Sequence, residues 1–448
     1  MPGPIFGPRG LVIAAPASGS GKTVFTLGLL RALHRRGRAV ASFKAGPDYI
    51  DPAFHAAATG APCRNLDPWA MRPGTLARLI ARAGGSELAI LEGAMGLFDG
   101  AQDGSGSTAD LAALTGWPVV LVADVRGQAG SAAALLRGFM THRSDIEVAG
   151  AVLNRVGSER HAAMLRRAIE PLGLPILGLL PQDARLGLPE RHLGLVQASE
   201  HGALETFLDE AAGLIEAGID LPALAALAKP ARPGAAGAAP APDTMLPPLG
   251  QRIAVARDDA FRFAYPALLE QWREAGAAID FFSPLADEAP SGEADAVFLP
   301  GGYPELHAGR LAANARLRQG LGEAAARGAT IYGECGGYML LGEGLVDAAG
   351  LSHRLAGLLP VETSFATRRR HLGYRALRLS ADGPLGRAGA RFRGHEFHYA
   401  TIVREGEGEP LFAAADAEGR ALGAMGRRRG KVFGSFLHLI DRSDAGTA

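Results

Sequence analysis

Cys335 lies in a glycine-rich turn and is the residue of this sequence best suited to act as a nucleophile. Residues Thr330 to Tyr332 predict a strand, which Gly333-Glu-Cys-Gly-Gly337 connects to a predicted helix. Glycines around the cysteine permit a strained turn that exposes the thiol at the strand end, and the helix N-terminus is expected to lower the thiol pKa. The pattern therefore favours a nucleophilic thiol over a buried structural cysteine.

Three further residues fit the same chemistry. A thiol nucleophile needs a base, and His438, which ends a predicted late apolar strand in Phe433 to His438, is the best candidate; a histidine satisfied within a core is the simpler alternative. The backbone N–H groups of Gly336 and of Gly302, which follows the predicted strand ending at Leu299, are expected to form an oxyanion hole.

A second chemical signature stands near the start of the chain. Residues 16 to 23 read Pro-Ala-Ser-Gly-Ser-Gly-Lys-Thr, after a predicted strand and at the start of a predicted helix. In this setting backbone N–H groups bind phosphates, the lysine reaches the terminal phosphates and the hydroxyl binds Mg²⁺. The full motif has glycine in place of Pro16, but its core is intact and favours ATP binding over an ordinary glycine turn. The expected contacts are Gly19, Ser20, Gly21, Lys22 and Thr23.

Acidic residues follow neighbouring strands of the same domain. Glu92 ends the predicted strand that starts at Leu88, and ligands of such sheets bind beyond the carboxyl ends of the strands, so Glu92 is expected to bind Mg²⁺ with Thr23. Asp48 and Asp51, in the loop after Lys44, are expected to bind Mg²⁺ or to orient an acyl substrate. Each acid has an alternative as a helix cap or turn residue, and the same holds for Asp99.

Asn154 ends another predicted strand, Val148 to Leu153. Its bidentate amide is expected to read the adenine edge of the nucleotide.

The pattern of strands and helices predicts two α/β domains. Short aliphatic runs alternate with helical patterns in both halves, which is typical of a doubly wound parallel sheet. Residues 229–250 are rich in Pro, Gly and Ala and predict a semi-rigid linker. We therefore expect a phosphate-loop domain over residues 1–228 and a second α/β domain over 251–448. The predicted strands are Leu11–Ala15, Ala39–Phe43, Leu88–Glu92, Val119–Ala123 and Val148–Leu153, then Arg252–Ala256, Ala277–Phe282, Ala296–Leu299 and Thr330–Tyr332.

Composition argues against several classes of protein. Lys plus Arg and Asp plus Glu both total 46 in 448 residues, so the chain lacks the basic excess of a nucleic-acid binder. Two cysteines are too few for a disulfide framework or a zinc site. The sequence shows no apolar run of the roughly 18 residues that cross a bilayer and no export signal. We expect a soluble cytoplasmic protein with no nucleic-acid or membrane partner, and a homodimer is left open.

Together these motifs make the chain similar to the cobyrinic acid a,c-diamide synthase family, including its hydrogenobyrinic acid form. The segments KAGPDYIDP, EGAMGLFDG, PGGYPE, GECGGYM, GHEFHY and SFLHL occur in the family's order, and the resemblance covers nearly the whole chain apart from the linker. It implies an N-terminal ATP-dependent amide ligase domain related to dethiobiotin synthetase and a C-terminal class I glutamine amidotransferase domain.

The resemblance also implies roles for individual residues. Cys335 and His438 hydrolyse glutamine. Asp48, Tyr49, Asp51, Glu92 and Asp99 serve ATP, the metal ion and the carboxylates of a corrinoid or related tetrapyrrole-derived substrate.

The chain departs from the ordinary class I triad, in which an acid follows the histidine by two residues. That position is Ile440, and Asp441 would point to the opposite face of a strand. The site is therefore expected to be a dyad, and what orients His438 stays open, with Glu396 as one candidate.

An arginine-dense segment gives the polycarboxylate substrate a candidate binding surface. Guanidinium groups match carboxylates bidentately, so Arg368 and Arg369 are expected to hold substrate carboxylates that do not react; a solvated loop is the alternative. The segment contains one acid, Asp382, and eight arginines: Arg368, Arg369, Arg370, Arg375, Arg378, Arg387, Arg391 and Arg393.

The reaction implied is phosphorylation of a carboxylate by ATP, followed by displacement of the phosphate by ammonia from glutamine, at two carboxylates in turn. The two sites lie on different domains, so an ammonia path between them is expected. Cobyric acid synthase, disfavoured by the KAGPDYIDP loop, and nickel sirohydrochlorin a,c-diamide synthase are alternative functions. Whether the macrocycle contains cobalt, nickel or no metal stays open. A partitioning or regulatory ATPase is the rival of another class, but the extra lysine of such loops is missing from Ala14 to Ser18.

Overall fold

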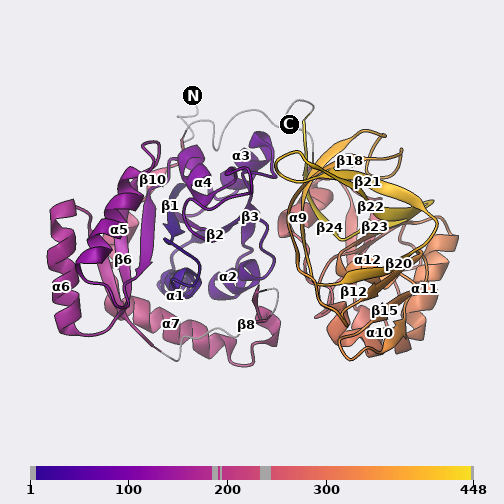
Figure 1. Ribbon diagram of the computed structural model, residues 1–448, viewed down its shortest axis with the longest axis horizontal. Helices are drawn as coiled ribbons and strands as arrows, with labels where there is room; N and C mark the ends of the chain where they lie inside the picture. The colour runs from indigo at the N-terminus through magenta and orange to yellow at the C-terminus, as the bar shows by residue number, and fades with distance from the viewer. Residues whose placement is uncertain (1–6, 184–189, 192–193, 233–243, 445–448) are drawn as a thin grey trace. The chain divides into compact units, whose positions relative to one another are not determined.

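The computed structural model describes residues 7–183, 190–191, 194–232 and 244–444. They form two compact units (Figure 1), one comprising Met1–Trp69 and Pro73–Pro240 and the other comprising Ala70–Arg72 and Ala241–Ala448. The boundary at 240 falls inside the expected linker. No helix in the described part of the chain is both long and apolar enough to cross a membrane.

The first unit is built on a parallel sheet with the strand order β3-β2-β4-β1-β5-β6-β7. Its central strand β1 is an almost continuous apolar run, as expected for a strand covered on both faces, and Leu11, Val12 and Ile13 are fully buried. The strands are β1 (Arg9–Ala14), β2 (Val40–Ala45), β3 (Arg64–Leu66), β4 (Leu88–Glu92), β5 (Val119–Asp124), β6 (Val148–Val156) and β7 (Ile176–Pro181).

Helices cover this sheet, and α1 lies beside α7 (Figure 1). Gly28 permits the close approach, because a Cβ at this position would lie 2.7 Å from the carbonyl oxygen of Ala211 on α7. The helices are α1 (Lys22–Arg35), α2 (Asp51–Thr59), α3 (Pro73–Ala81), α4 (Thr108–Thr115), α5 (Gly130–Thr141), α6 (Glu159–Ile169), α7 (Leu204–Gly218) and α8 (Leu221–Ala226).

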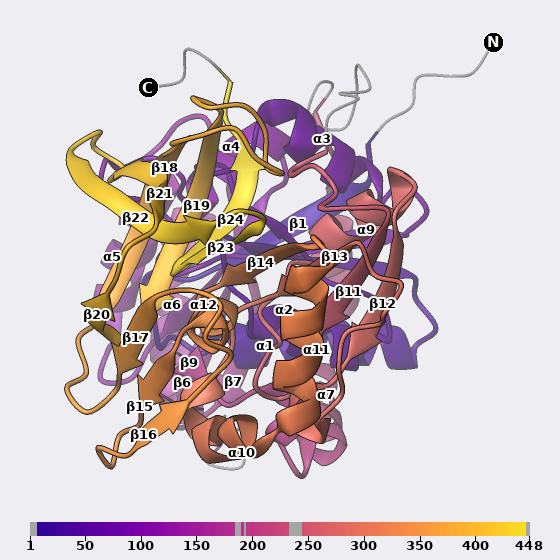
Figure 2. The ribbon, with the colours of Figure 1, turned by 90° about the vertical axis from the view of Figure 1, so that its right-hand side faces the viewer.

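The second unit contains a ten-stranded mixed sheet with the order β12-β11-β13-β14-β23-β22-β21-β18-β19-β24 (Figure 2). The first five strands in this order, β12, β11, β13, β14 and β23, pair in parallel, and the remaining pairs are antiparallel. The strands are β11 (Arg252–Ala256), β12 (Ala278–Phe282), β13 (Ala296–Leu299), β14 (Thr330–Glu334), β18 (His371–Leu379), β19 (Arg391–His398), β21 (Glu409–Ala415), β22 (Ala421–Arg429), β23 (Val432–Ser435) and β24 (Leu437–Arg442).

Four helices and a small second sheet complete this unit. Helix α11 packs against β14, and α12 follows β14 directly in the chain. The helices are α9 (Pro266–Glu274), α10 (Ala308–Ala313), α11 (Ala315–Ala326) and α12 (Gly336–Leu341), and the small sheet consists of β15 (Gly344–Val346), β16 (Ser352–Arg354), β17 (Val361–Ser364) and β20 (Thr401–Glu405).

Each of the nine strands predicted from the sequence forms, and eight of them lie within one or two residues of their expected bounds; β6 ends three residues later than expected, at Val156. One further expectation is wrong, because the segment expected to end in His438 is not one strand. It breaks at Phe436 into β23 and β24, so His438 is the second residue of β24.

The ends of the expected linker belong to the folded units. Lys229–Pro230 forms β10 and pairs antiparallel with β1. Met245 and Leu246 are fully buried, and the backbone of Leu246 accepts a hydrogen bond of 3.2 Å from the indole N–H of Trp272. Residues 233–243 of the linker lie outside the described residues. The sequence analysis missed this packing because Met245 and Leu246 are among the few large apolar residues in a segment rich in Pro and Ala.

This packing predicts that Leu246→Ala destabilises the second unit by about 2 to 5 kcal/mol, as truncation of a buried leucine does. If Leu246 were part of an exposed linker, the same substitution would change the free energy of unfolding very little. Leu351→Ala, at a leucine that is 62% exposed in the same unit, is the control. Thermal unfolding should show a clear drop in the midpoint for Leu246→Ala alone, and equal midpoints for the two variants would contradict the assignment.

Candidate active sites

The phosphate loop of the first unit requires glycine at two positions. Gly19 and Gly21 have φ values of 78° and 87°, a left-handed conformation that side chains with a Cβ disfavour. Gly21 caps α1, so the helix begins at Lys22. The Ser20 hydroxyl donates to the Ala17 carbonyl at 2.8 Å and closes the turn. The N-terminus of α1 thus follows the tight turn that sequence analysis predicted.

Glu92 is the centre of a buried charge network. Its Oε1 atom lies 2.8 Å from the Thr23 hydroxyl, 2.9 Å from Lys44 Nζ and 3.3 Å from Lys22 Nζ. Its Oε2 atom lies 2.6 Å from His55 Nε2. Burial alone would raise the Glu92 pKa, but Lys44, Lys22 and His55 outweigh it and hold the pKa well below its usual range. Glu92 is therefore a carboxylate at neutral pH.

The oxygen atoms gathered here fit a divalent cation. Thr23 Oγ1, in the first turn of α1, and Glu92 Oε1, at the end of β4, are hard oxygen donors of the kind that Mg²⁺ prefers, and the same Glu92 oxygen also bonds Lys22 and Lys44. Lys44 forms ion pairs with Asp51 and Glu92, and the negative charges of Asp51, Glu92 and Asp48 all raise its pKa. The three acids therefore lie around one lysine. Thr23 and Glu92 are the pair best placed to share a cation.

Asp48 and Asp51 also have structural partners. Asp48 Oδ1 accepts hydrogen bonds from the N–H groups of Ile50 and Asp51 at 2.8 and 2.9 Å, which is the capping role considered as the alternative. Burial and the neighbouring Asp51 raise the pKa of Asp48 to about 6. The Asp51 carboxylate is bonded to Lys44, and Tyr49 between the two acids is half-buried.

The loop after β4 lies against the phosphate loop. Gly93 and Leu97 donate backbone hydrogen bonds to Ile13 and Ala15, which precede that loop, both at 2.9 Å. Asp99 is exposed, and its Oδ2 atom accepts the Gly96 N–H at 2.8 Å. Asp99 therefore holds this loop and still presents a carboxylate to solvent.

Asn154, the residue expected from the sequence to read adenine, supports the phosphate loop. Its Nδ2 atom donates to the Ser20 carbonyl at 2.9 Å, and its Oδ1 atom accepts the Arg155 N–H at 2.9 Å. A Cβ on Gly21 would lie 2.2 Å from Nδ2, so this contact itself requires glycine. Arg155 adds a bond of 2.7 Å to the Gly19 carbonyl. Both ends of the Asn154 amide bond protein atoms in this structure, and the adenine contact stays a prediction.

Cys335 occupies the strained turn that the sequence predicts. Its φ of 46° and ψ of −102° make it one of four non-glycine residues with positive φ in the described part of the chain. Its N–H donates to the Ser435 carbonyl at 2.8 Å, and its carbonyl accepts from Met339 in α12. The strand β14, the turn and α12 thereby fix the direction of the thiol.

Gly301 lies against both the Cys335 and the His438 side chains and leaves the space that they occupy. A Cβ on Gly301 would lie 2.3 Å from His438 Cε1, 3.1 Å from His438 Nε2 and 3.2 Å from Cys335 Cβ. The predicted oxyanion pair is also close, because a Cβ on Gly336 would lie 3.0 Å from the backbone nitrogen of Gly302. The structure therefore groups Cys335, His438, Gly302 and Gly336, although they come from three distant segments.

The resting thiol and imidazole are both neutral. Burial, reinforced by the charge of Glu305, raises the pKa of Cys335. The Gly336 N–H at the start of α12 lowers the pKa as expected, but burial outweighs it, so the expected net lowering is wrong. Burial and the nearby His395 and His398 lower the pKa of His438 to about 3. A neutral imidazole can accept the thiol proton during attack, but both pKa shifts disfavour the charged pair in the resting site.

Two acids considered as partners of His438 are bonded elsewhere. Glu396 binds Arg375 at 2.7 Å and His398 at 3.0 Å. Asp441 accepts hydrogen bonds from Arg72, a residue of the same unit. The Glu396 candidate is therefore not supported, and the expected exclusion of Asp441 agrees with its position.

The structure leaves Arg368 and Arg369 on an exposed loop between β17 and β18. The loop is tied to the end of the GHEFHY segment by a hydrogen bond of 3.1 Å from the Arg369 N–H to the Tyr399 carbonyl. Both guanidinium groups are accessible to a ligand, but the structure does not join them to the thiol site.

Sequence reasoning missed His55 and Gly301. His55 lies four residues after Asp51 on the same face of α2, a spacing that was available as a signal. Its Nδ1 atom lies 3.5 Å from the sulfur of Cys63. Gly301 was part of a noted segment, but its role depends on a contact with β24 that the sequence does not show.

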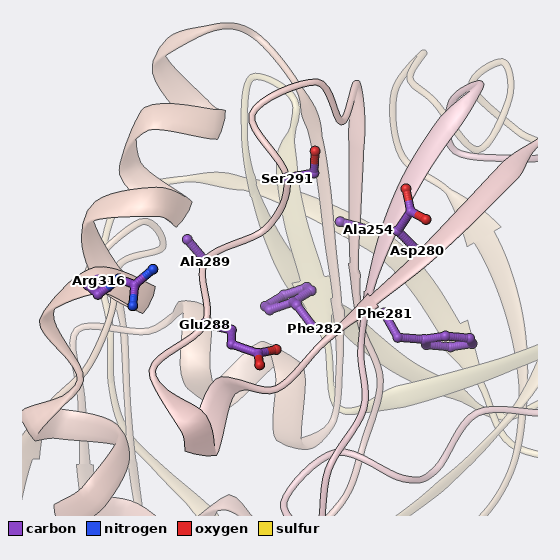
Figure 3. Close-up of a pocket in the computed structure, with 8 residues that line it drawn as sticks. All are labelled: Ala254, Asp280, Phe281, Phe282, Glu288, Ala289, Ser291 and Arg316. Carbon is purple, nitrogen blue, oxygen red and sulfur yellow. The ribbon is translucent and has the colours of Figure 1, made fainter.

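A cavity of about 290 Å³ in the second unit is separate from these residues (Figure 3). Figure 3 shows the Phe282 ring at its centre, with the Arg316 side chain entering from α11. Cys335 and His438 do not line it. Its walls are formed by Ala254, Asp280, Phe281, Phe282, Glu288, Ala289, Ser291 and Arg316.

Family comparisons match both units. Residues 11–196 match the CobQ/CobB/MinD/ParA nucleotide binding domain, and residues 252–445 match the CobB/CobQ-like glutamine amidotransferase domain. The first unit is thus a nucleotide-binding domain, and the second is a glutamine amidotransferase domain.

Whole-chain comparisons find similar proteins of one name. The chain is 59% identical over 441 residues to hydrogenobyrinate a,c-diamide synthase of Brucella suis, covering 97% of this chain and 99% of that protein. It is 54% identical over 441 residues to the protein of the same name from Rhodobacter capsulatus, with the same coverage. Among solved structures, PurLQS from Thermotoga maritima matches with a TM-score of 0.31 and 18% identity, covering 43% of this chain and 88% of that one.

The raised pKa of Cys335 predicts slow alkylation at neutral pH, because iodoacetamide reacts with the thiolate. The rate should keep rising above pH 9, where an ordinary thiol with a pKa of about 8.5 levels off. Mass spectrometry of the Cys335 peptide at a series of pH values measures this rate. A plateau below pH 8 would show that the thiol is activated before substrate binds.

The contact at Gly301 predicts that Gly301→Ala abolishes glutamine hydrolysis, because the added methyl group overlaps the imidazole. We expect a loss of at least about 100-fold, the scale of losing a general base. Gly322→Ala is the matched control, since a Cβ there meets nothing within 4 Å. Equal glutaminase rates for the two variants would show that His438 does not occupy this position during turnover.

Proposed function

Because the chain belongs to the hydrogenobyrinate a,c-diamide synthase family, we propose that it amidates the a and c carboxylates of hydrogenobyrinic acid, using ATP and glutamine. The observation that carries this proposal is the pairing of a buried thiol and imidazole in one unit with a phosphate loop and its acidic network in the other. The identity to relatives of that name favours the metal-free macrocycle over cobyrinic acid. Glutamine supplies the nitrogen.

In the glutaminase reaction, His438 takes the proton of Cys335 as the sulfur attacks the amide carbon of glutamine. The N–H groups of Gly302 and Gly336 bind the oxyanion that forms. The imidazolium then gives its proton to the departing nitrogen, which leaves as ammonia. Water hydrolyses the remaining thioester to glutamate and restores the thiol.

In the synthetase reaction, a substrate carboxylate oxygen attacks the terminal phosphorus of ATP, and ADP leaves. The acyl phosphate then reacts with ammonia at its carbonyl carbon, and phosphate leaves. Phosphorylation is required because a carboxylate is a poor electrophile. Lys22 and the N–H groups of residues 19–23 bind the phosphates and stabilise the charge that moves during transfer. The cycle repeats at the second carboxylate.

Glu92 and Thr23 would hold Mg²⁺, with the free oxygen of Asp48 as a further ligand. The ion supplies positive charge to the phosphate oxygens. Asp99, Tyr49 and Asp51 are proposed to contact the macrocycle on the same side of the sheet. Arg368 and Arg369 are proposed to bind carboxylates that do not react.

The proposal predicts that Cys335→Ser reduces glutamine-dependent amidation by at least about 1,000-fold while added ammonium salts still support amidation. Lys22→Ala should abolish amidation with either nitrogen source, because it acts on the phosphates. Product formation from hydrogenobyrinic acid and from its cobalt form should be measured side by side.

Full glutamine-dependent activity in Cys335→Ser would show that the Cys335 thiol is not the nucleophile in glutamine hydrolysis. Ammonia-dependent activity in Lys22→Ala would exclude the proposed phosphate site, and faster turnover of the cobalt form would reverse the substrate assignment.

A further inference from the structure

Glu334, the residue immediately before the nucleophile, faces His438 from the end of β14. Its side chain is 3% exposed, and its Oε2 atom lies 3.8 Å from His438 Nδ1. The other ring nitrogen, Nε2, is the one near Gly301 and Cys335. The imidazole therefore lies between the thiol on one side and a carboxyl group on the other.

The Glu334 side chain is held in this position by two hydrogen bonds to its Oε1 atom. The Tyr332 hydroxyl donates at 2.8 Å, and the Leu439 N–H donates at 3.0 Å. Leu439 is the next residue after His438, so the same carboxyl group fixes the backbone of β24 and faces its imidazole. Strands β14 and β24 are not neighbours in the sheet, and this contact joins them.

We propose that Glu334 is the positioning residue that orients His438 for glutamine hydrolysis, in place of the acid that Ile440 cannot supply. In its ionised form it holds the Nδ1–H tautomer, which leaves Nε2 as the proton acceptor, and it stabilises the imidazolium formed during attack. A small rotation closes the 3.8 Å separation, since catalytic hydrogen bonds are often long before substrate binds. The inference rests on the proposed glutaminase function.

The surrounding charges agree with this role. The groups that act on the imidazole from β19 are His395 and His398, and both disfavour a positive charge on it. Glu396, on the same strand, is bonded to Arg375 and His398. Burial raises the pKa of Glu334 to about 8, against the opposing hydrogen bonds from Leu439 and Tyr332. A positive charge that develops on His438 favours the ionised form of this acid.

The test is Glu334→Gln, which keeps an oxygen for Tyr332 and Leu439 but removes the acid. We expect kcat for glutamine hydrolysis to fall by about 10²- to 10⁴-fold, the range for replacing the acid of a triad by its amide. The KM for glutamine should stay within about threefold, and ammonia-dependent amidation should be unchanged. Glu334→Asp should recover part of the lost kcat.

Asp416→Asn is the matched control, because Asp416 is a similarly buried acid between β21 and β22 of the same sheet and should leave kcat unchanged. If Glu334→Gln fails to fold by thermal unfolding, Tyr332→Phe, which removes one anchor of the carboxyl group, should lower kcat by about tenfold at constant KM.

A kcat within threefold of the wild-type value in Glu334→Gln would overturn the inference, as would a larger loss in Glu396→Gln. An absence of glutamine hydrolysis in the wild-type protein would instead reject the proposed function.

Discussion

A parallel strand that is covered on both faces has to remain apolar until it ends, and both chemical sites of this chain follow from that constraint. Strand β4 is buried along its whole length and carries its single acid, Glu92, at the last position. Strand β14 ends in Glu334 and leads directly into Cys335. The ends of the strands are where a charged side chain meets loop backbone and helix N-termini, so the polar groups of each unit collect at one edge of its sheet.

The two units compensate their buried polar groups in different ways. Glu92 is surrounded by Lys22, Lys44 and His55, which keep it ionised. The thiol site contains few compensating charges, so Cys335 and His438 both rest in their neutral forms. The first arrangement suits binding of a charged ligand, and the second suits a proton transfer that takes place only when substrate is present.

The sequence predicted nine of the parallel strands, though not β3 or β7, and the two glycine-rich turns, because apolar runs and glycine spacing are local signals. It did not predict β18 or β22, in which glycines and arginines interrupt the apolar pattern, or β21, whose burial does not alternate regularly. The glycine-rich turn around Cys335 allowed the pairing of Cys335 with His438 to be predicted. The position of Glu334 beside His438 depends on the contact between β14 and β24, which the sequence does not show. Likewise, the contact of Asn154 with Ser20 depends on how two loops pack, which no pattern of residue types records.

The burial of Cys335 has a consequence for the durability of the protein. Peroxide and disulfides react with thiolates, and the resting site holds almost none at neutral pH because burial raises the thiol pKa. In the proposed mechanism, the thiol therefore stays protonated until glutamine enters and the proton moves to His438. A protonated thiol reacts more slowly both with oxidants and with the substrate carbonyl.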